Sequence, residues 1–352
     1  MLQPIQDLSS FSLDYATARA QFLNRLDRAD GAFGLHSFAH PLAGPAGEAL
    51  ACDVASLGIG ASCEALLLVL CGTHGVEGLA GSAVLCDLME PLRTLQAGQP
   101  GLGVMLVHGL NPWGMAWLRR GDADNVDLNR NFVDFSAALP RNPAYEQAHR
   151  RLLDGATPAA AELDALSTGQ YSHADGLFYG GREPSWSRRT VEALGAWPVF
   201  DQLGRVAVID LHTGLGPFGY GEVINDHAPG SAGDALARAW FGPNAASTAE
   251  GQSFSVPKPG LMDYFWHQRL GDRGCCVTLE FGTQPMAAML DRLIDEQRYA
   301  NACAERGQSR DITHPSVRAL RELFYPAHPS WQAQVLWRSR QVVDMALQGL
   351  RA

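Results

Sequence analysis

Lysine is almost absent from this sequence, because only Lys258 occurs among its 352 residues. A Gly-Lys-Ser/Thr phosphate loop is therefore excluded, and little scope remains for Schiff-base catalysis. The net charge of −10 offers no basic stripe to a phosphate backbone, so we expect neither nucleic acid nor an anionic membrane as a partner. No segment approaches the ~18 consecutive apolar residues of a membrane-spanning helix.

Signals for export, redox chemistry and serine catalysis are also missing. Residues 1–8 contain neither the basic stretch nor the apolar core of a signal peptide, which predicts a cytoplasmic protein. The seven cysteines form no Cys-x-x-Cys pair and lie mostly in apolar runs, which is typical of reduced core residues. No Gly-x-Ser-x-Gly motif is present, so the usual serine hydrolase is excluded.

One apolar run leads directly into a turn that carries two metal-ligand side chains. Residues 66–71 (Leu-Leu-Leu-Val-Leu-Cys) have the length and composition of a buried strand, and the chain continues as Gly-Thr-His74-Gly-Val-Glu77. Histidine and glutamate are both good zinc ligands. His-x-x-Glu is a weak signal when taken alone, and the competing interpretation is a turn histidine bonded to the backbone.

The same arrangement recurs at two further strands, which are predicted over residues 205–211 and 275–279. Three apolar strands thus end in an acid/base or ligand-type residue followed closely by glycine: His74-Gly75, His212-Thr-Gly214 and Glu280-Phe-Gly282. Because strands alternate with helices, we expect an α/β fold with a largely parallel sheet and helices on both faces. The carboxyl ends of these strands would then converge on one rim.

Helical patterns flank these strands, and no repeat, low-complexity tract or linker divides the chain. We therefore expect a single domain over residues 1–352, with a motif-bearing core at about 60–285, an N-terminal helix at 10–28 and C-terminal helices within 315–350. Further helices are predicted over residues 77–95, 143–166, 187–204 and 285–305. Residues 167–182 are predicted to form a long loop rich in glycine and aromatic residues, and loops of this length are usually functional.

The chemistry that these residue types permit is metal-assisted hydrolysis. His74, Glu77 and His212, arranged around an open fourth position, would form a catalytic zinc shell with one zinc ion per chain. Glu280, at the next strand end, is a natural general base. The segment 119–132, which begins Arg119-Arg120, suits an anionic substrate because guanidinium groups bind carboxylates. The alternative for this segment is a solvated loop with internal Asp–Arg pairs.

The ordered set of motifs resembles the carboxypeptidase A-like zinc carboxypeptidase superfamily. The residues that carry this resemblance are His74-Gly-Val-Glu77, Asn111-Pro-x-Gly114, Val126-Asp-x-Asn-Arg-Asn131, His212 and Glu280. More narrowly, Asp-Leu-His-Thr-Gly-Leu-Gly (210–216) and Leu-Glu-Phe-Gly-Thr (279–283) look like an uncharacterised bacterial branch, a domain of unknown function. Aspartoacylase and succinylglutamate desuccinylase are more distant relatives. The resemblance covers roughly residues 60–285 and implies a three-layer phosphorylase/hydrolase-like fold.

The resemblance also implies roles for individual residues. His74, Glu77 and His212 would bind zinc, and Glu280 would act as general base. Asn129 and Arg130 would grip a substrate carboxylate, and Asp127 would orient the first zinc histidine. Arg120, or alternatively Arg119, would polarise the scissile carbonyl, the other arginine remaining a candidate substrate contact. The family's substrate-capping tyrosine falls near Ser255, where no tyrosine stands, and Tyr171, Tyr179 and Tyr264 are candidate replacements.

These inferences predict a zinc-dependent hydrolase of an amide or peptide bond in a small molecule or short peptide with a free carboxylate. A metallocarboxypeptidase-like enzyme is the first hypothesis, and an aspartoacylase-like deacylase of N-acyl amino acids is the alternative. From another class, the chain could be an inactive zinc- or peptide-binding protein. Glu280 and Arg120 together argue against a pure binder, which needs neither. A homo-oligomer remains open, as does a second metal, to which Asp122, Asp124 or His108 could contribute.

Overall fold

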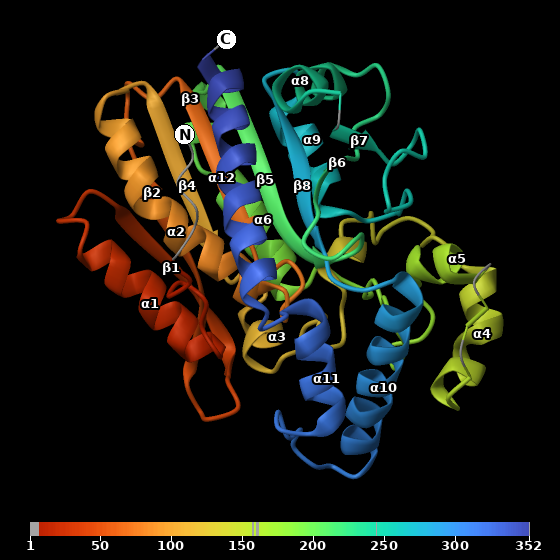
Figure 1. Cartoon of the computed structure of the whole chain (residues 1–352). Coiled ribbons are helices and arrows are strands. Elements are labelled where there is room, and N and C mark those ends of the chain that lie inside the picture. Colours follow the sequence, from red (N-terminus) through yellow and green to blue (C-terminus); the bar gives the residue numbers. More distant parts are fainter. Residues whose placement is uncertain (1–6, 157, 160–161, 244, 352) are drawn as a thin grey trace.

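A twisted mixed sheet runs through the middle of the molecule (Figure 1). The computed structural model describes residues 7–351 except 157, 160, 161 and 244, so most of the segment 1–8 lies outside the described residues. Within the described part of the chain, eight strands are paired in the order β1-β2-β4-β3-β5-β8-β6-β7. Their bounds are β1 (Gly34–Ala43), β2 (Ala49–Leu57), β3 (Ala65–Cys71), β4 (Leu102–His108), β5 (Arg205–Gly214), β6 (Gly221–Asn225), β7 (Ala245–Ser247) and β8 (Gly274–Gly282).

The centre of the sheet is parallel and its edges are mixed. Strands β4, β3, β5 and β8 are parallel neighbours, whereas β1 pairs antiparallel with β2, β2 with β4, and β6 with β8. The chain passes from β3 to β4 on one side of β3 and later returns to β5 on its other side. In an open α/β sheet, such a reversal leaves a crevice at the carboxyl ends of the strands, where ligands bind.

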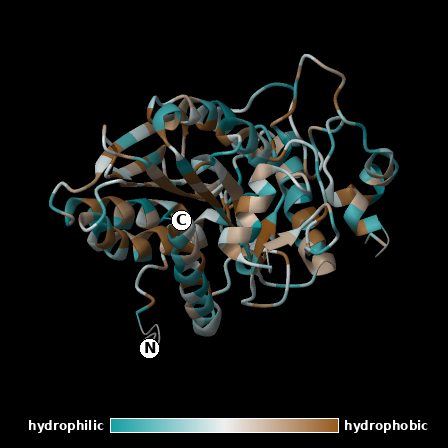
Figure 2. Cartoon of the chain, turned by 90° about the horizontal axis from the view of Figure 1, so that it is seen from above, coloured by the Kyte–Doolittle hydropathy of each residue, from teal (hydrophilic) through white to brown (hydrophobic). Residues whose placement is uncertain are grey.

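Helices cover both faces of the sheet, as predicted, and Figure 2 shows the apolar strands between the helical layers. The helices and the one 3₁₀ turn in the described residues are α1 (Tyr15–Asp27), α2 (Gly78–Ala97), α3 (Pro112–Ala116), η1 (Leu128–Arg130), α4 (Pro143–Leu153), α5 (Leu163–Ser167), α6 (Trp186–Gly195), α7 (Val199–Gln202), α8 (Ala232–Phe241), α9 (Met262–Leu270), α10 (Met286–Glu305), α11 (Pro315–Phe324) and α12 (Pro329–Arg351). Alternate residues of β3 pack on the two layers: Leu67 and Val69 join the core with α1, α2 and α12, whereas Leu66 and Leu68 join the core with α6 and α9.

Several predicted boundaries were wrong for local reasons. The helix predicted over 10–28 begins at Tyr15, because the Asp14 side chain caps it by accepting a hydrogen bond of 2.7 Å from Thr17 N. The helix predicted over 143–166 is split into α4 and α5, and Gly155, with φ +95°, follows the end of α4. The helix predicted over 187–204 is likewise interrupted, with Pro198 immediately before α7.

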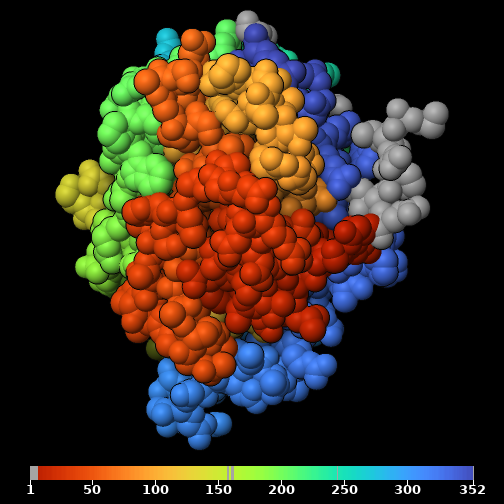
Figure 3. All heavy atoms as spheres, turned by 90° about the vertical axis from the view of Figure 1, so that its left-hand side faces the viewer, coloured from red at the N-terminus to blue at the C-terminus, as the bar shows by residue number. Residues whose placement is uncertain are grey.

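The N-terminal part of the chain forms one side of the molecule, where Figure 3 shows it in red and orange around α1, β1 and β2. All seven cysteines are buried and unpaired. Among the described residues, no helix combines the length and the apolar character that crossing a bilayer requires.

Candidate active site and metal centre

The fold brings the three predicted strand ends together. His74 lies in the turn after β3, Glu77 immediately precedes α2, and His212 lies near the end of β5. Strand β5 pairs with β3 on one side and with β8 on the other, and His212 and Glu280 are register partners in the second pair. The parallel register therefore places residues that are 206 positions apart in the sequence, from 74 to 280, at one edge of the sheet.

A close approach of two backbone turns fixes the position of His74. A Cβ atom at Gly75 would lie 2.1 Å from the carbonyl carbon of Gly114, so only glycine fits beside the segment that begins at Asn111. The backbone nitrogen of Gly75 donates to the carbonyl oxygen of Arg120 at 3.0 Å. The turn that presents His74 is thus bonded directly to the segment that presents Arg120.

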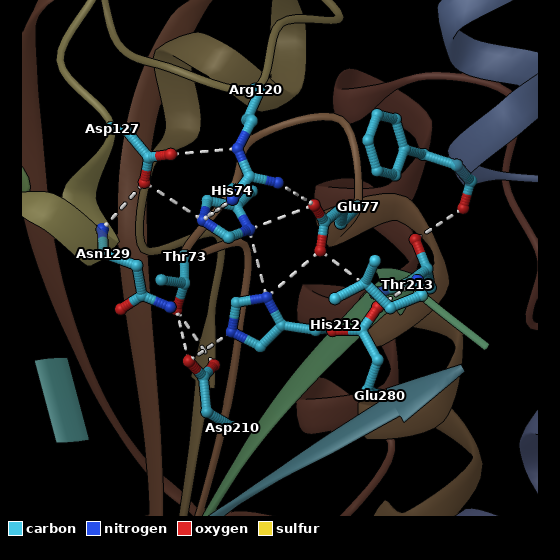
Figure 4. Close-up of polar contacts among 12 residues, drawn as sticks. Thr73, His74, Glu77, Arg120, Asp127, Asn129, Asp210, His212, Thr213 and Glu280 are labelled. Atoms are coloured by element: carbon cyan, nitrogen blue, oxygen red, sulfur yellow. Dashed lines mark hydrogen bonds and ion pairs between the residues drawn. The ribbon is translucent and has the colours of Figure 1, made fainter. Parts of the chain in front are cut away.

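Three potential ligand atoms point toward one another (Figure 4). The Nδ1 atoms of His74 and His212 are 3.1 Å apart. Glu77 Oε1 lies 3.0 Å from His74 Nδ1, and Glu77 Oε2 lies 3.1 Å from His212 Nδ1. Ligand atoms on a tetrahedral zinc ion with bonds of ~2.0–2.1 Å are about 3.3 Å apart. The three buried side chains therefore fit one zinc ion with only small adjustments.

A carboxylate contacts the outer nitrogen of each histidine. Asp127 Oδ1 lies 3.1 Å from His74 Nε2, and Asp210 Oδ2 lies 2.6 Å from His212 Nε2. Such partners fix the tautomer and the orientation of a metal-binding imidazole. The tautomer in which each Nε2 donates to its carboxylate would leave both Nδ1 lone pairs free for a shared metal ion.

Asp210 is a site residue that the sequence analysis missed. Its carboxylate also accepts a hydrogen bond of 2.9 Å from Thr73 Oγ1, which joins the turn after β3 to β5. The signal that could have found it is the two-residue period of a strand, because Asp210 and His212 share a face of β5.

The buried acidic and basic groups of this cluster shift one another's pKa values. Burial opposes the ionised form of Glu77, but the neighbouring His74 and His212 outweigh it and hold the pKa of the carboxyl far below its usual range. Burial likewise opposes the charge of His212, yet Asp210 and Glu77 raise its pKa. Buried groups that stabilise one another's charge in this way are concentrated at functional sites.

Arg120 faces this cluster. Its Nη1 donates to Glu77 Oε1 at 3.1 Å and its Nε to Asp127 Oδ2 at 2.9 Å. Its Nη2 lies 2.8 Å from His74 Nε2. If His74 held a metal through Nδ1, its Nε2 would carry the proton and would donate to Asp127 rather than accept from Arg120.

Glu280 is buried beside the cluster, with 7% of its surface exposed. Its Oε1 accepts a hydrogen bond of 2.9 Å from the backbone nitrogen of Leu215. Burial and the negative charge of Glu77 raise the pKa of the Glu280 carboxyl to about 7. A carboxyl group with a pKa near neutrality is well matched to accepting and returning a proton.

A pocket with about 710 Å³ of empty space, including its open mouth, joins these side chains to further charged residues. Asn129 and Arg130 line its wall. Arg130 is buried, and its Nη1 and Nη2 donate to the carbonyl oxygens of Asn129 and Ser167, each at 2.6 Å. Asn129 Oδ1 accepts from Met262 N at 3.0 Å. Both side chains are thus held in place at the edge of the pocket.

Arg119, by contrast, does not lie in the pocket, so the expectation that it contacts the substrate is not supported. Its guanidinium group is buried against α10, where it pairs with Glu296 at 3.1 Å and donates to Gln297 Oε1 at 2.9 Å. The residue before it, Leu118, has a positive φ of +54°. Of the two candidates, only Arg120 lines the pocket.

The candidate replacements for the missing tyrosine are also absent from the pocket lining. Tyr171 OH donates to the carbonyl oxygen of Arg130 at 2.5 Å, Tyr264 OH donates to that of Lys258 at 3.0 Å, and Tyr179 is buried in a backbone bridge. The pocket is instead lined by Ser255 and Lys258. The sequence singled out Lys258 only as the one lysine, although it lies three residues after Ser255, the position at which the family's capping tyrosine was expected.

Comparison with known proteins supports this fold. A family model described as "Protein of unknown function (DUF2817)" matches residues 11–165 and 158–338. The structure is similar to carboxypeptidase A from Helicoverpa armigera, with a TM-score of 0.54 and 10% sequence identity over 96% of this chain and 73% of that chain. At this identity the similarity shows the fold alone.

Other matches are weaker. A metallo-carboxypeptidase from Burkholderia cenocepacia gives a TM-score of 0.44 at 13% identity, covering 93% of this chain and 68% of that chain. An aspartoacylase family protein from Mesorhizobium loti gives a TM-score of 0.37 at 16% identity, covering 79% and 68%. No curated protein matches the sequence. The resemblance to the carboxypeptidase A-like fold, in a branch of unknown function, is confirmed.

Proposed function

The chain belongs to the DUF2817 family, whose function is unknown, and from this premise we propose that it is a zinc-dependent hydrolase of an amide bond in a small carboxylate-bearing substrate. The observation that carries the proposal is the convergence of His74 Nδ1, His212 Nδ1 and the Glu77 carboxylate, 3.0 to 3.1 Å apart, beside Glu280 in one pocket. Because residues from 74 to 280 meet on one sheet, we also propose that residues 1–352 act as a single hydrolase domain.

Each side chain has a distinct part in the proposed reaction. His74, Glu77 and His212 would hold a zinc ion, which would supply Lewis acidity and make water a better nucleophile near neutral pH. Glu280 accepts the proton of the attacking water and passes it to the leaving amine. Arg120, which lines the pocket beside the cluster, donates to the carbonyl oxygen as negative charge develops there.

Substrate recognition is assigned to the far wall of the pocket. Arg130 and Asn129 hold the carboxylate of the substrate, since a guanidinium group binds a carboxylate through two parallel hydrogen bonds. Lys258 adds a second positive charge. Its Nζ donates to Ser255 Oγ and to the carbonyl oxygen of Val256, and burial together with the charge of Arg130 lowers its pKa to about 8. The ammonium group is thus mostly charged at pH 7 and remains available to an anion.

The test is a substrate panel assayed with zinc-loaded protein. Dipeptides with a blocked amino end and a free carboxylate represent the carboxypeptidase hypothesis, and N-acetyl and N-succinyl amino acids represent the deacylase hypothesis. Cleavage of one group over the other decides between them. Binding of zinc without hydrolysis of any member would contradict the proposal and favour the inactive binding protein.

If Glu280 is the general base, the rate of hydrolysis should depend on pH in a defined way. Because burial and Glu77 raise the pKa of Glu280 to about 7, and because a base works as the carboxylate, kcat/KM should rise with pH and level off above that value. A bound dication stabilises the carboxylate, so the midpoint should lie at or below about 7. A pH profile of kcat/KM measures this. A rate that decreases with rising pH below the midpoint would rule out a carboxylate base.

Lys258 should make a measurable contribution to substrate binding. Replacing Lys258 with Met should raise KM for a carboxylate substrate about 10- to 150-fold and leave kcat nearly unchanged, because a charge-assisted hydrogen bond contributes ~1.5–3 kcal/mol. Lys258→Arg is the matched control and should retain most of the affinity. If the carboxamide analogue of the substrate loses as much affinity as the carboxylate does, Lys258 has a structural role only.

A further inference from the structure

A second group of metal-ligand side chains lies outside the candidate active site. His149 on α4 faces His173 and Asp175 in the loop before Phe178, and their ligand atoms all lie within 4.8 Å of one another. His149 Nε2 is 3.4 Å from Asp175 Oδ1, and the rings of His149 and His173 are stacked with centroids 3.8 Å apart. In the described part of the chain, His74, Glu77 and His212 form the only other such group.

The backbone that carries two of these ligands is held on both sides. Gln170 Oε1 accepts from His173 N at 2.8 Å, and Gln170 Nε2 donates to His173 O at 2.7 Å. Asn125 Nδ2 donates to the carbonyl oxygens on either side of Asp175, each at 2.8 Å, and Asn301 Nδ2 donates to the carbonyl oxygen of Asp175 itself at 2.9 Å. A metal ligand on a loop gains affinity when the loop is already ordered in this way.

The side chains are suited to an ion that enters from solvent. His149 is 6% exposed, and its Nδ1 has no hydrogen-bond partner among the described residues. The nitrogen that faces the cluster is Nε2, and its 3.4 Å contact with Asp175 Oδ1 is longer than a good hydrogen bond of ~2.7–3.2 Å, so the fold alone pairs this edge of the ring only weakly. The Asp175 side chain is 59% exposed, which leaves the cluster accessible.

We propose that His149, His173 and Asp175 form a second metal site, which binds a divalent transition-metal ion such as Zn²⁺ through two imidazoles and one carboxylate. This ligand set suits Zn²⁺. Because the lone pairs of two stacked rings run side by side, binding one ion requires the partly exposed His173 ring to turn toward it. The residues that the sequence left open for a second metal do not gather in this way. His108 Nε2 contacts Ser82 Oγ at 3.0 Å, and Asp122 accepts from the backbone of its own turn.

Binding there would brace the wall of the candidate active site. The ion would tie α4 to the loop that continues into Phe178, a residue with φ +52°. The Phe178 ring faces the guanidinium carbons of Arg120 and Arg130, at 5.4 and 5.7 Å from its centroid. The site therefore has a structural role beside both arginines, and it rests on its own residues, independently of the proposed hydrolysis.

Metal counting tests the proposal without any activity assay. After equilibration with Zn²⁺ and removal of the unbound ion, elemental analysis of the wild-type chain should give about two zinc ions per chain. His173→Gln/Asp175→Asn should lower the content by about one, whereas His328→Gln, an exposed histidine elsewhere, should not change it. Uptake that is unchanged in His173→Gln/Asp175→Asn would overturn the proposal.

A second experiment uses the variant His74→Ala/His212→Ala, which lacks two of the ligands of the candidate active site. We expect this variant to retain about one zinc ion, which is lost when His173→Gln/Asp175→Asn is added, and Zn²⁺ should raise its melting temperature only while the second site is intact. Because His173 and Asp175 are not buried, their replacement opens no core, and circular dichroism of the metal-free proteins checks the fold. A folded His74→Ala/His212→Ala protein that takes up no zinc would reject the site without touching the proposed hydrolysis.

Discussion

Replacing Glu280 with Gln should lower kcat by about 10²- to 10⁴-fold, which is the usual contribution of a general acid–base residue. The amide keeps the size of the carboxyl group and can still accept the hydrogen bond from Leu215 N. Zinc content and substrate affinity should therefore stay close to those of the wild type, and the loss should fall on kcat. Steady-state kinetics on the best substrate of the panel, combined with elemental analysis, makes this measurement.

The matched control is Glu222→Gln. Glu222 is also buried, is the register partner of Glu280 in the β6–β8 pair, and accepts a hydrogen bond of 2.9 Å from Ser253 Oγ outside the pocket lining. Its replacement should leave kcat within a few-fold of the wild type, because the Glu222 side chain does not line the pocket and so cannot take the proton of the attacking water. Wild-type kcat in Glu280→Gln, or an equal loss in Glu222→Gln, would remove Glu280 from the mechanism.

Replacing His74 with Ala should lower the metal content by about one ion per chain and abolish hydrolysis. The remaining ligands, Glu77 and His212, leave a catalytic zinc ion one protein ligand short of the three that such sites use. The dissociation constant of the metal at this site can be measured by titration with a chelator. It should increase far more in His74→Ala than in a variant of a residue that contacts a ligand without binding the metal.

Asp210→Asn provides that comparison. Its carboxylate contacts His212 Nε2 without reaching the shared centre, so the expected loss of metal affinity is about 10- to 100-fold. The loss of zinc affinity should be larger in His74→Ala than in Asp210→Asn. If His74→Ala binds zinc as tightly as Asp210→Asn does, His74 is a turn residue, and the zinc ion, if one binds, is held elsewhere.

The sequence by itself determined the parts of this site that depend on local rules. The apolar run 66–71 and the spacing of His74 and Glu77 specify a strand, a turn and the start of a helix, and these need no distant information. The strands before His212 and Glu280 were identified in the same way. Parallel pairing then brings their ends to one rim, because the carboxyl ends of parallel strands lie at the same edge of a sheet.

Only the tertiary structure decided which way neighbouring side chains point and which distant segments meet. Arg119 and Arg120 are adjacent, yet the first is buried against α10 and the second lines the pocket. Lys258 lines the pocket from the segment near Ser255, for which the sequence had suggested only a missing tyrosine, and His149 lies beside Asp175, 26 residues further along the chain. The periodicity of the sequence does not predict these contacts, because they depend on how the loops pack between the helices and strands. The path of a loop is determined by long-range contacts rather than by local propensity.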